Sequence, residues 1–211
     1  MRAEVRLDEV PSDIEEAIKK AKDEDLASLP QEVVNRIMQH YGLDYPKSDN
    51  FITKDEALEF CKKFFPNPLV LKLSAPDALH KTEMKGIYLN IKDEASFNEA
   101  WNALRESIDK FELKNASILI QEQIVKSAEA IIGVNSDSTF GRVMIFGSGG
   151  IYTEVMKDTS LRVLPTADFD NMIKDTKIGT ILNGVRGEKP KAVKELKETL
   201  EKIQKLSLEL R

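Results

Sequence analysis

The feature that most constrains the fold is a change of hydrophobic pattern in the middle of the chain. Residues 93–109 repeat apolar side chains at helical spacing, with Phe97, Trp101, Leu104 and Ile108 on one stripe. Three short apolar runs follow this segment, ASILIQEQI, AEAIIGVNS and RVMIFGS, and polar turns separate them. Short apolar runs joined by turns are typical of antiparallel strands. The pattern therefore predicts an amphipathic helix followed by an antiparallel strand cluster.

Two helices are predicted before this point. SLPQEVVNRIMQHYGL has helical spacing, with Ser28 as a plausible N-cap and Gly42 as the stop. DYPKSDNF is expected to be a connector. Thr53 then begins TKDEALEFCKKFF, with Glu56 three residues on as a capping box.

The remaining elements complete an α+β pattern. NPLVLKLS and GIYLNI predict two strands with a loop containing Pro76 between them, and SLRVLP predicts a later strand. Two short helices are expected around 168–183, before a long terminal helix. This order predicts an α+β protein of two lobes with a ligand cleft between them. We expect a helical appendage or linker at 1–30, one lobe with the loop of His80 at 31–115 and the other lobe at 116–211.

Composition narrows the class of protein. The 211 residues carry a net charge of −5, which argues weakly against nucleic-acid binding. No apolar run approaches the roughly 18 residues of a membrane span. The N-terminal segment has no apolar signal core, so we expect a cytoplasmic protein. One cysteine and two histidines argue against a zinc site, and Cys61 is expected to be a structural thiol in a helix.

Several residues invite a chemical interpretation, each beside a simpler one. The glycines of GSGG at 147–150 suit a phosphate nest or an ordinary turn, and the chain has neither a P-loop nor a Rossmann glycine motif. Lys72 lies inside an apolar strand, either solvated or aimed at phosphate oxygens. Glu122 and Glu129 are surface carboxylates, or one marks a hinge and the other binds ribose. His80 is an exposed loop histidine or a nucleophile for phosphoryl transfer.

The motifs around these residues resemble a known family. KLSAPDALHKTEMKGIYLNI is similar to the histidine loop in the beta subunit of ADP-forming acetyl-CoA synthetases. ILIQEQIVKSAEAIIGVNSDSTFGRVMIFGSGGIYTEVMKDTSLRVLP resembles the strand and glycine-loop core of that family, and ILNGVRG resembles a later element. The resemblance covers about 31–190 in order. It implies an ATP-grasp fold, related to the one in succinyl-CoA synthetase.

The resemblance also implies a catalytic role for His80. This histidine would take a phosphoryl group from a histidine of the alpha subunit and pass it to ADP. Lys72 would contact the nucleotide phosphates. The implied cofactors are ATP or ADP and Mg²⁺, with CoA bound by the alpha subunit or by a fused alpha domain. The expected assembly is therefore a hetero-oligomer.

Further nucleotide contacts follow from the same resemblance. Glu122, Gln123 and Ile124 would form the interlobe hinge beside adenine, and Glu129 would bind the ribose. The phosphate end of the cleft would be formed by Gly149, Gly150, Asp158 and Arg162.

Two departures from the family pattern stand out. Lys85-Gly86 replaces a glycine pair after the histidine. In the family a strand with an Asp-x-Asn-Pro motif follows the terminal helix and holds magnesium, and these residues contain no such motif. We therefore expect an ATP-grasp fold without its last C-terminal strands and no magnesium ligands within this sequence.

Three functions are consistent with the sequence. The first is the nucleotide-binding beta part of an ADP-forming acyl-CoA synthetase, which couples thioester cleavage to ATP formation. The second is a truncated, non-catalytic ATP-grasp module that binds a nucleotide or a partner. The third is another kind of ATP-grasp carboxylate ligase, which His80-Lys81 disfavours because such ligases use no phosphohistidine.

Overall fold

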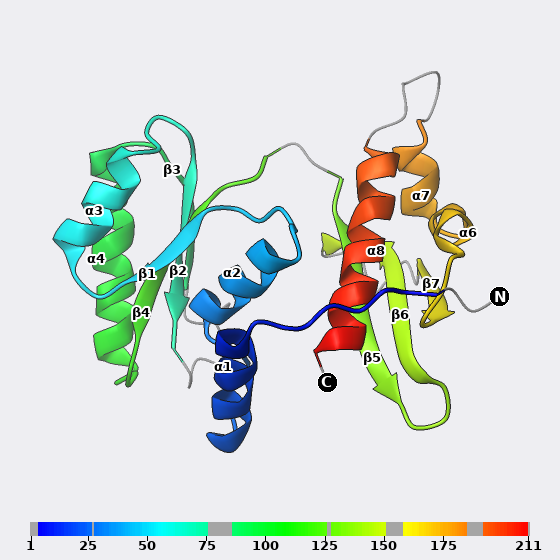
Figure 1. The fold of residues 1–211 in the computed structure, drawn as a ribbon. Helices are drawn as coiled ribbons and strands as arrows, with labels where there is room; N and C mark the ends of the chain where they lie inside the picture. Colours follow the sequence, from blue (N-terminus) through cyan, green and yellow to red (C-terminus); the bar gives the residue numbers. More distant parts are fainter. Residues whose placement is uncertain are drawn as a thin grey trace. The chain divides into compact units, whose positions relative to one another are not determined.

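The computed structural model describes residues 4–26, 28–75, 86–125, 128–150, 158–184 and 192–210. The chain forms two compact units (Figure 1). The inserted unit comprises residues 30–32 and 44–125, and the discontinuous unit comprises residues 1–29, 33–43 and 126–211. Among the described residues, no helix is long and apolar enough to cross a membrane.

The inserted unit is a four-stranded antiparallel sheet with two helices on one face. Its strands run in the order β1-β4-β2-β3. Along the chain the elements are β1 (Ser48–Phe51), α3 (Lys54–Lys62), β2 (Leu69–Ser74), β3 (Ile87–Ile91), α4 (Glu94–Lys110) and β4 (Ser117–Glu122).

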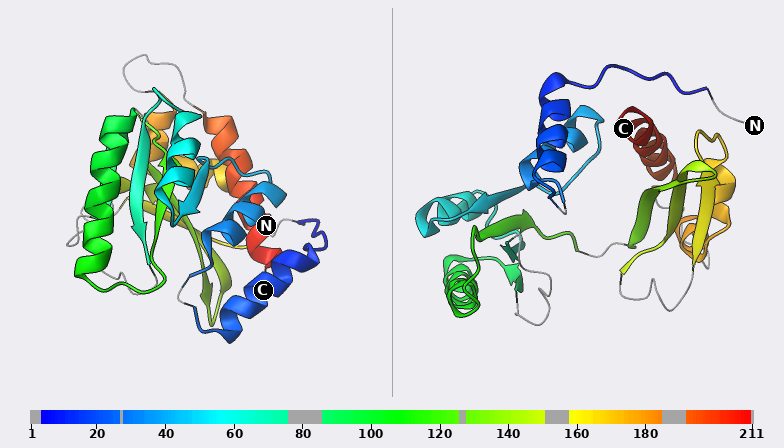
Figure 2. Two further views of the ribbon diagram at one scale, coloured as in Figure 1. Left: turned by 90° about the vertical axis from the view of Figure 1, so that its left-hand side faces the viewer. Right: turned by 90° about the horizontal axis from the view of Figure 1, so that it is seen from below.

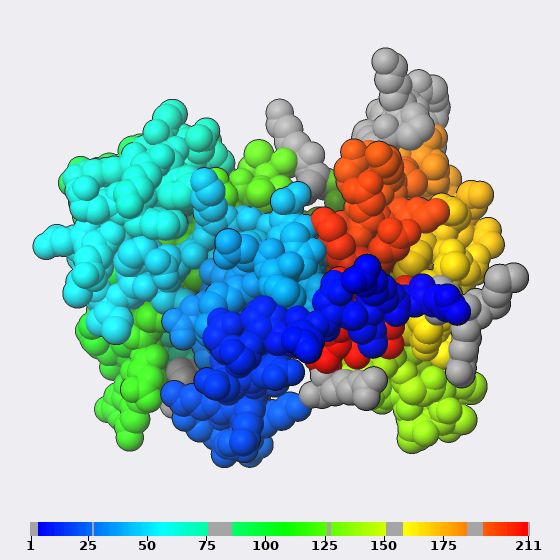
Figure 3. Space-filling model, in the orientation of Figure 1, coloured from blue at the N-terminus to red at the C-terminus, as the bar shows by residue number. Residues whose placement is uncertain are grey.

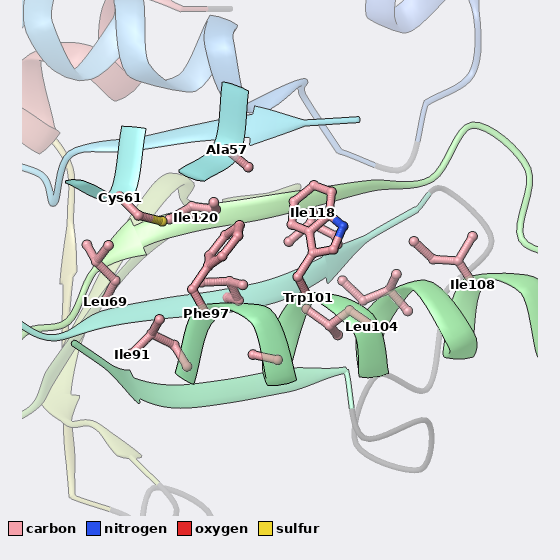
Figure 4. Packing of buried hydrophobic residues seen from close by; sticks show 13 residues of the cluster. Ala57, Cys61, Leu69, Ile91, Phe97, Trp101, Leu104, Ile108, Ile118 and Ile120 are labelled. Atoms are coloured by element: carbon pink, nitrogen blue, oxygen red, sulfur yellow. The ribbon is translucent and has the colours of Figure 1, made fainter. Parts of the chain in front are cut away.

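The core of this unit lies between the sheet and its helices (Figure 4). Leu69, Leu71 and Leu73 alternate along β2 and are fully buried on this side. The apolar stripe of α4 packs against the same face of the sheet, which confirms the helix expected from its spacing. Each fully buried leucine contributes about 1.5–3 kcal/mol to folding. Cys61 is buried here too, and burial raises the pKa of its thiol to about 12.

The discontinuous unit contains a three-stranded antiparallel sheet in the order β5-β6-β7. Helices α6 to α8 pack on one face of the sheet, against Met144 and Phe146 (Figure 2). The elements are α1 (Ser12–Asp23), α2 (Gln31–His40), β5 (Ala130–Asp137), β6 (Gly141–Ser148), β7 (Thr159–Val163), α6 (Phe169–Lys174), α7 (Lys177–Leu182) and α8 (Val193–Glu209).

The N-terminal region is part of this unit. Ile14 of α1 is 2% exposed and packs in one cluster with α2 and the end of α8. The Tyr41 hydroxyl donates to Glu209 at 2.7 Å, and the Asp8 N–H donates to the same carboxylate at 2.6 Å. Figure 3 shows the first described residues lying over the end of α8. The sequence predicts a helical appendage here. The structure has the helix, α1, but Ile14 joins a core cluster of the unit.

The lobe boundary also differs from the expected one. The sequence predicts it between residues 115 and 116, yet β4 pairs with β1 and β2 in the inserted unit. Strand pairing depends on residues far away in the sequence, so the change of pattern at this point does not reveal the partner. DYPKSDNF, expected as a connector, contains β1.

The expected caps are only partly correct. Thr53 is the N-cap of α3, but its hydroxyl donates to the Glu56 carboxylate and makes no cap hydrogen bond to the backbone. The helix assigned to Ser28 begins at Gln31, so Ser28 is not its N-cap. Gly42 ends this region with a φ of +59°, as a glycine stop requires.

Candidate functional site

Lys72 lies on the face of the inserted sheet that α3 and α4 do not cover. Alternation along β2 sends the neighbouring leucines into the core and Lys72 to the opposite face. The side chain is half-buried, and its Nζ donates to the Oε1 of Gln121 at 2.7 Å. The sequence left open whether Lys72 is solvated or aimed at a ligand. The structure shows that its ammonium group contacts Gln121 on the neighbouring strand β4.

The end of β4 carries the predicted hinge. The Glu122 N–H donates to the Lys47 carbonyl at 3.0 Å, and the Glu122 carboxylate accepts from the Lys47 N–H at 2.8 Å. The Gln123 N–H donates to the Pro68 carbonyl at 2.9 Å. Beyond these anchors the chain leaves the sheet, and Ile124 is 64% exposed. These hydrogen bonds fix the backbone at Glu122 and Gln123, directly before the exposed side chain of Ile124.

The glycine turn after β6 brings two predicted site residues together. The Gly149 N–H donates to the Glu129 carbonyl at 2.7 Å. Gly150 has a φ of +76°, and a Cβ there would lie 2.5 Å from the Glu129 Oε2. A side chain at Gly150 would therefore be strained and would also displace the Glu129 carboxylate. The structure places an exposed carboxylate directly beside a backbone turn.

Asp158 is held by protein groups. It is 7% exposed, and its carboxylate accepts from the Ser148 hydroxyl at 2.5 Å. It also accepts from the N–H groups of Lys177 at 2.7 Å and Ile178 at 3.0 Å. Burial raises the pKa of the Asp158 carboxyl, but these hydrogen bonds outweigh burial and hold the pKa below its usual value. Asp158 thus ties the end of β6 to the start of α7.

Arg162 is held in a similar way. Its guanidinium donates to Asp168 at 2.9 Å and to Asp175 at 2.7 Å, near the two ends of α6. It also donates to the Ser160 hydroxyl and the Leu161 carbonyl. The hydrogen bond to Asp175 is the largest cause that raises the pKa of Arg162, and the Asp168 carboxylate adds to it. In this structure the guanidinium fastens β7 to α6.

One surface is not predicted from the sequence. The face of the β5-β6-β7 sheet opposite α6 to α8 carries apolar side chains from all three strands. Its members are Ile131, Val143, Ile145, Leu161 and Val163. Ile131 is 42% exposed and Leu161 is 58% exposed. The signal was present, because β5 and β6 are apolar at positions of both parities, whereas a one-sided strand alternates.

The predicted site residues thus fall into two groups. Lys72 and the hinge belong to the inserted unit, and the residues from Glu129 to Arg162 belong to the discontinuous unit. His80 lies outside the described residues. Among the residues that the structure does describe, no three His, Cys, Asp or Glu side chains gather as a metal site.

Comparison with known proteins places these features in a family. Residues 20–211 match the ATP-grasp domain family. The chain is 34% identical over 175 residues to the beta subunit of acetate–CoA ligase [ADP-forming] II from Pyrococcus furiosus, covering 81% of this chain and 74% of the relative. It is 32% identical over 199 residues to the isoenzyme I beta subunit of the same organism, covering 92% and 85%.

A longer relative and a solved structure extend the comparison. The chain is 32% identical over 191 residues to 4-hydroxybutyrate–CoA ligase [ADP-forming] of Nitrosopumilus maritimus, covering 89% of this chain but 27% of that protein. It is 28% identical, with a TM-score of 0.78, to the dinucleotide-forming acetyl-coenzyme A synthetase 1 of Ca. Korarchaeum cryptofilum, covering 93% and 86%. That structure holds coenzyme A and Mg-AMPPCP, with its phosphohistidine segment pointing towards the nucleotide-binding site.

Proposed function

This chain belongs to the ATP-grasp domain family, with the beta subunits of ADP-forming acetate–CoA ligases, and we propose that it is the nucleotide-binding part of an ADP-forming acyl-CoA synthetase. The enzyme class of these relatives is acid–thiol ligase. In the proposed reaction, cleavage of an acyl-CoA thioester drives the formation of ATP from ADP and phosphate.

The observation that carries this proposal is the arrangement of β2 and β4. Two adjacent strands of one sheet carry the Lys72 ammonium and the anchored peptides at Glu122 and Gln123. An ammonium group neutralises phosphate oxygens, while backbone groups at the end of a strand hydrogen-bond to a base. Lys72 would therefore bind the phosphates, and the segment from Glu122 to Ile124 would lie against adenine.

The discontinuous unit would supply the remaining nucleotide contacts. The Glu129 carboxylate would accept hydrogen bonds from ribose hydroxyls. Gly149 and Gly150 would let the backbone approach phosphate oxygens, because neither has a side chain in the way. Asp158 and Arg162 would support the phosphate end indirectly, by holding the strands and helices around the turn.

The transfer itself would use His80 as the phosphate carrier. An imidazole nitrogen of His80 attacks the phosphorus presented by the alpha subunit, an N–P bond forms and the bond to the donor breaks. A terminal phosphate oxygen of ADP then attacks the same phosphorus, and the N–P bond breaks to return neutral imidazole and ATP. No net oxidation or reduction occurs. Support for His80 comes from its motif in the sequence and from the phosphohistidine segment of the solved relative.

The proposal requires an alpha subunit or a fused alpha domain that binds CoA. The beta-subunit relatives favour such a partner. Magnesium would neutralise phosphate charge when it is bound, and its ligands would come from outside the described residues. We expect the partner to select the acyl substrate, because relatives named for acetate and for 4-hydroxybutyrate match this chain about equally well.

A second candidate is a non-catalytic ATP-grasp module that binds a nucleotide or a partner without turnover. The protein contacts of Asp158 and Arg162 favour it, because both charged groups of the expected phosphate end are engaged in holding the fold. The two candidates differ in whether phosphate becomes covalently attached to the chain.

The test is phosphorylation of the chain by a partner alpha subunit with acyl-CoA, phosphate, Mg²⁺ and ADP. We expect acid-labile phosphate on His80 and loss of ATP formation in His80→Ala. His40→Ala is the matched control, because His40 is the only other histidine and is exposed at the end of α2. Equal ATP formation by His80→Ala and the parent would overturn the phosphate-carrier role. Nucleotide binding without any phosphorylation would favour the second candidate.

A further inference from the structure

The contact between Lys72 and Gln121 points to a role for a residue to which neither motif nor comparison assigns one. Lys72 pairs with Leu119 across β2 and β4, and Gln121 pairs with Val70. Lys72 and Gln121 are therefore diagonal neighbours on one face of the sheet, a separation that long side chains span. The Lys72 Nζ reaches the Gln121 Oε1 at 2.7 Å.

The chemistry of the pair is specific. A lysine ammonium has only donors, so Gln121 must present its amide oxygen. This oxygen is a neutral acceptor, so it directs the ammonium without cancelling its charge. A carboxylate in the same place would direct it equally well but would form an ion pair, leaving little net charge for a ligand.

The surroundings of the pair strengthen this effect. Val70 is 6% exposed and Leu119 is half-buried, and both lie on the same face as Lys72. Apolar neighbours lower the local dielectric, so both hydrogen bonds and charges act more strongly there than in water. The choice between a neutral and a charged acceptor at position 121 therefore has a large effect on an anion near Lys72.

We propose that Gln121 is a positioning and specificity-determining residue, which orients Lys72 and preserves its charge for the phosphates of a nucleoside diphosphate or triphosphate. This inference rests on the proposed function, because it assigns the anion at Lys72 to the nucleotide. It also explains why Gln121 is polar, although its neighbours Val70 and Leu119 on the same face of the sheet are apolar.

The first test compares Gln121→Glu with the parent in equilibrium binding of ADP, with adenosine as the phosphate-free probe. We expect Gln121→Glu to weaken ADP binding by about 10- to 100-fold and to leave adenosine binding within about 3-fold. Asn50→Asp is the matched control. It adds the same charge to the same face, but Asn50 pairs with Leu119 from β1, two strand spacings, or about 10 Å, from Lys72. Equal losses in the two variants would overturn the inference.

The second test asks whether Gln121 acts through Lys72. Gln121→Leu should weaken ADP binding by about 3- to 10-fold, and this loss should disappear when it is introduced into Lys72→Met. A loss that persists in the Lys72→Met background would show that Gln121 acts by another route and would overturn its positioning role.

A third measurement separates this inference from the proposed function. Competitive labelling of Lys72 with acetic anhydride, in the protein without nucleotide, reports how its amine is held. We expect faster labelling in Gln121→Leu and slower labelling in Gln121→Glu than in the parent. If the parent bound no ADP but showed these changes, the proposed function would fail while the Lys72–Gln121 relationship stood. Labelling rates that do not change would contradict the relationship itself.

Discussion

Two hydrogen bonds join Gln123 to Asn90 at a β-bulge in β3. The register of β2 and β3 shifts between Leu69 and Leu71, where β3 has one residue more than β2. Asn90 lies at this extra position with a φ of +60°, which asparagine tolerates better than most residues. Its N–H donates to the Gln123 Oε1 at 2.6 Å, and the Gln123 amide donates to its side chain at 3.3 Å.

This relationship sets which side chains of β3 face the core. Below the bulge, Tyr88 pairs with Leu71 and Ile87 pairs with Lys72. A shift by one residue would exchange the two faces. The Gln123 side chain therefore has a structural role, because both of its polar atoms bond to Asn90.

The first prediction concerns the bulge. Asn90→Ala should lower the free energy of unfolding of the inserted unit by about 2 kcal/mol, because it removes a hydrogen bond and strains the positive φ. Asn90→Gly should cost less, since glycine accepts this φ. Trp101, the single tryptophan, lies in this core and reports urea unfolding by fluorescence. Equal costs for the two variants would show that backbone strain plays no part.

The second prediction concerns the glycine at the end of β6. A Cβ on Gly147 would lie 2.0 Å from the Asp158 carbonyl oxygen, so Gly147→Ala must move β7. We expect a loss of about 3 kcal/mol or more in thermal unfolding. Gly141→Ala is the control, because Gly141 has a φ of +77° but a Cβ there would meet no atom within 4 Å, and it should cost about 1 kcal/mol. A milder effect at Gly147 would contradict the close approach.

The third prediction concerns Asp158 and pH. Asp158→Ala should destabilise the discontinuous unit by about 2–4 kcal/mol, because two helix N–H groups and the half-buried Ser148 hydroxyl lose their acceptor. The folded pKa is lowered, so this stabilisation is present above the usual carboxyl pKa near 3.8 and is lost as the pH falls through the folded value.

The measurement is urea unfolding of the parent and of Asp158→Ala from pH 7 to pH 2. The difference in the free energy of unfolding between the two proteins should be constant above about pH 5 and shrink below it. Asp170→Ala is a useful comparison, because Asp170 is an exposed carboxylate paired with Lys197. A difference that grows on acidification would have the wrong sign for a lowered pKa.

The fourth prediction distinguishes the structural role of Arg162 from direct phosphate binding. Arg162→Lys keeps the charge but cannot reach Asp168 and Asp175 together, as the guanidinium does. We expect a lower melting temperature, while ADP affinity measured well below that temperature stays within about 3-fold of the parent. A large loss of ADP affinity in the folded variant would instead assign Arg162 to the phosphate.

The fifth prediction uses Cys61 as a probe of opening. The thiol is fully buried in the inserted unit, and burial raises its pKa to about 12, so it stays protonated at neutral pH. Native protein should react with a disulfide reagent only through opening of this unit. The core variant Leu71→Ala should accelerate labelling strongly, whereas exposed Lys63→Ala should not. Rapid labelling of the parent would contradict the buried position.

Much of the local structure is readable from the sequence. The stripe from Phe97 to Ile108 predicts both the helix and its buried face, because helical spacing alone decides which side chains share a face. Lys72 is also recognisable as an exception within an apolar strand. The face of the sheet to which Lys72 points is not readable from the sequence, because it depends on which face α3 and α4 cover.

The candidate site residues are likewise only partly predictable from the sequence. Glu129, Gly149 and Gly150 follow from motifs, and the structure brings all three into contact. Asp158 and Arg162 follow from motifs in the same way, but the structure surrounds both with protein hydrogen bonds. Their partners lie 1 to 20 residues away in the chain, and no sequence motif indicates such contacts.

The sequence by itself determined the helices, most strands, the α+β class and the family, because periodicity and ordered motifs are local properties of the chain. The tertiary structure alone decided that β4 joins the inserted unit, that the N-terminal region packs on α8, and that Gln121 holds Lys72. Each of these depends on residues that are distant in sequence. Strand pairing and burial select those contacts only when the whole unit folds.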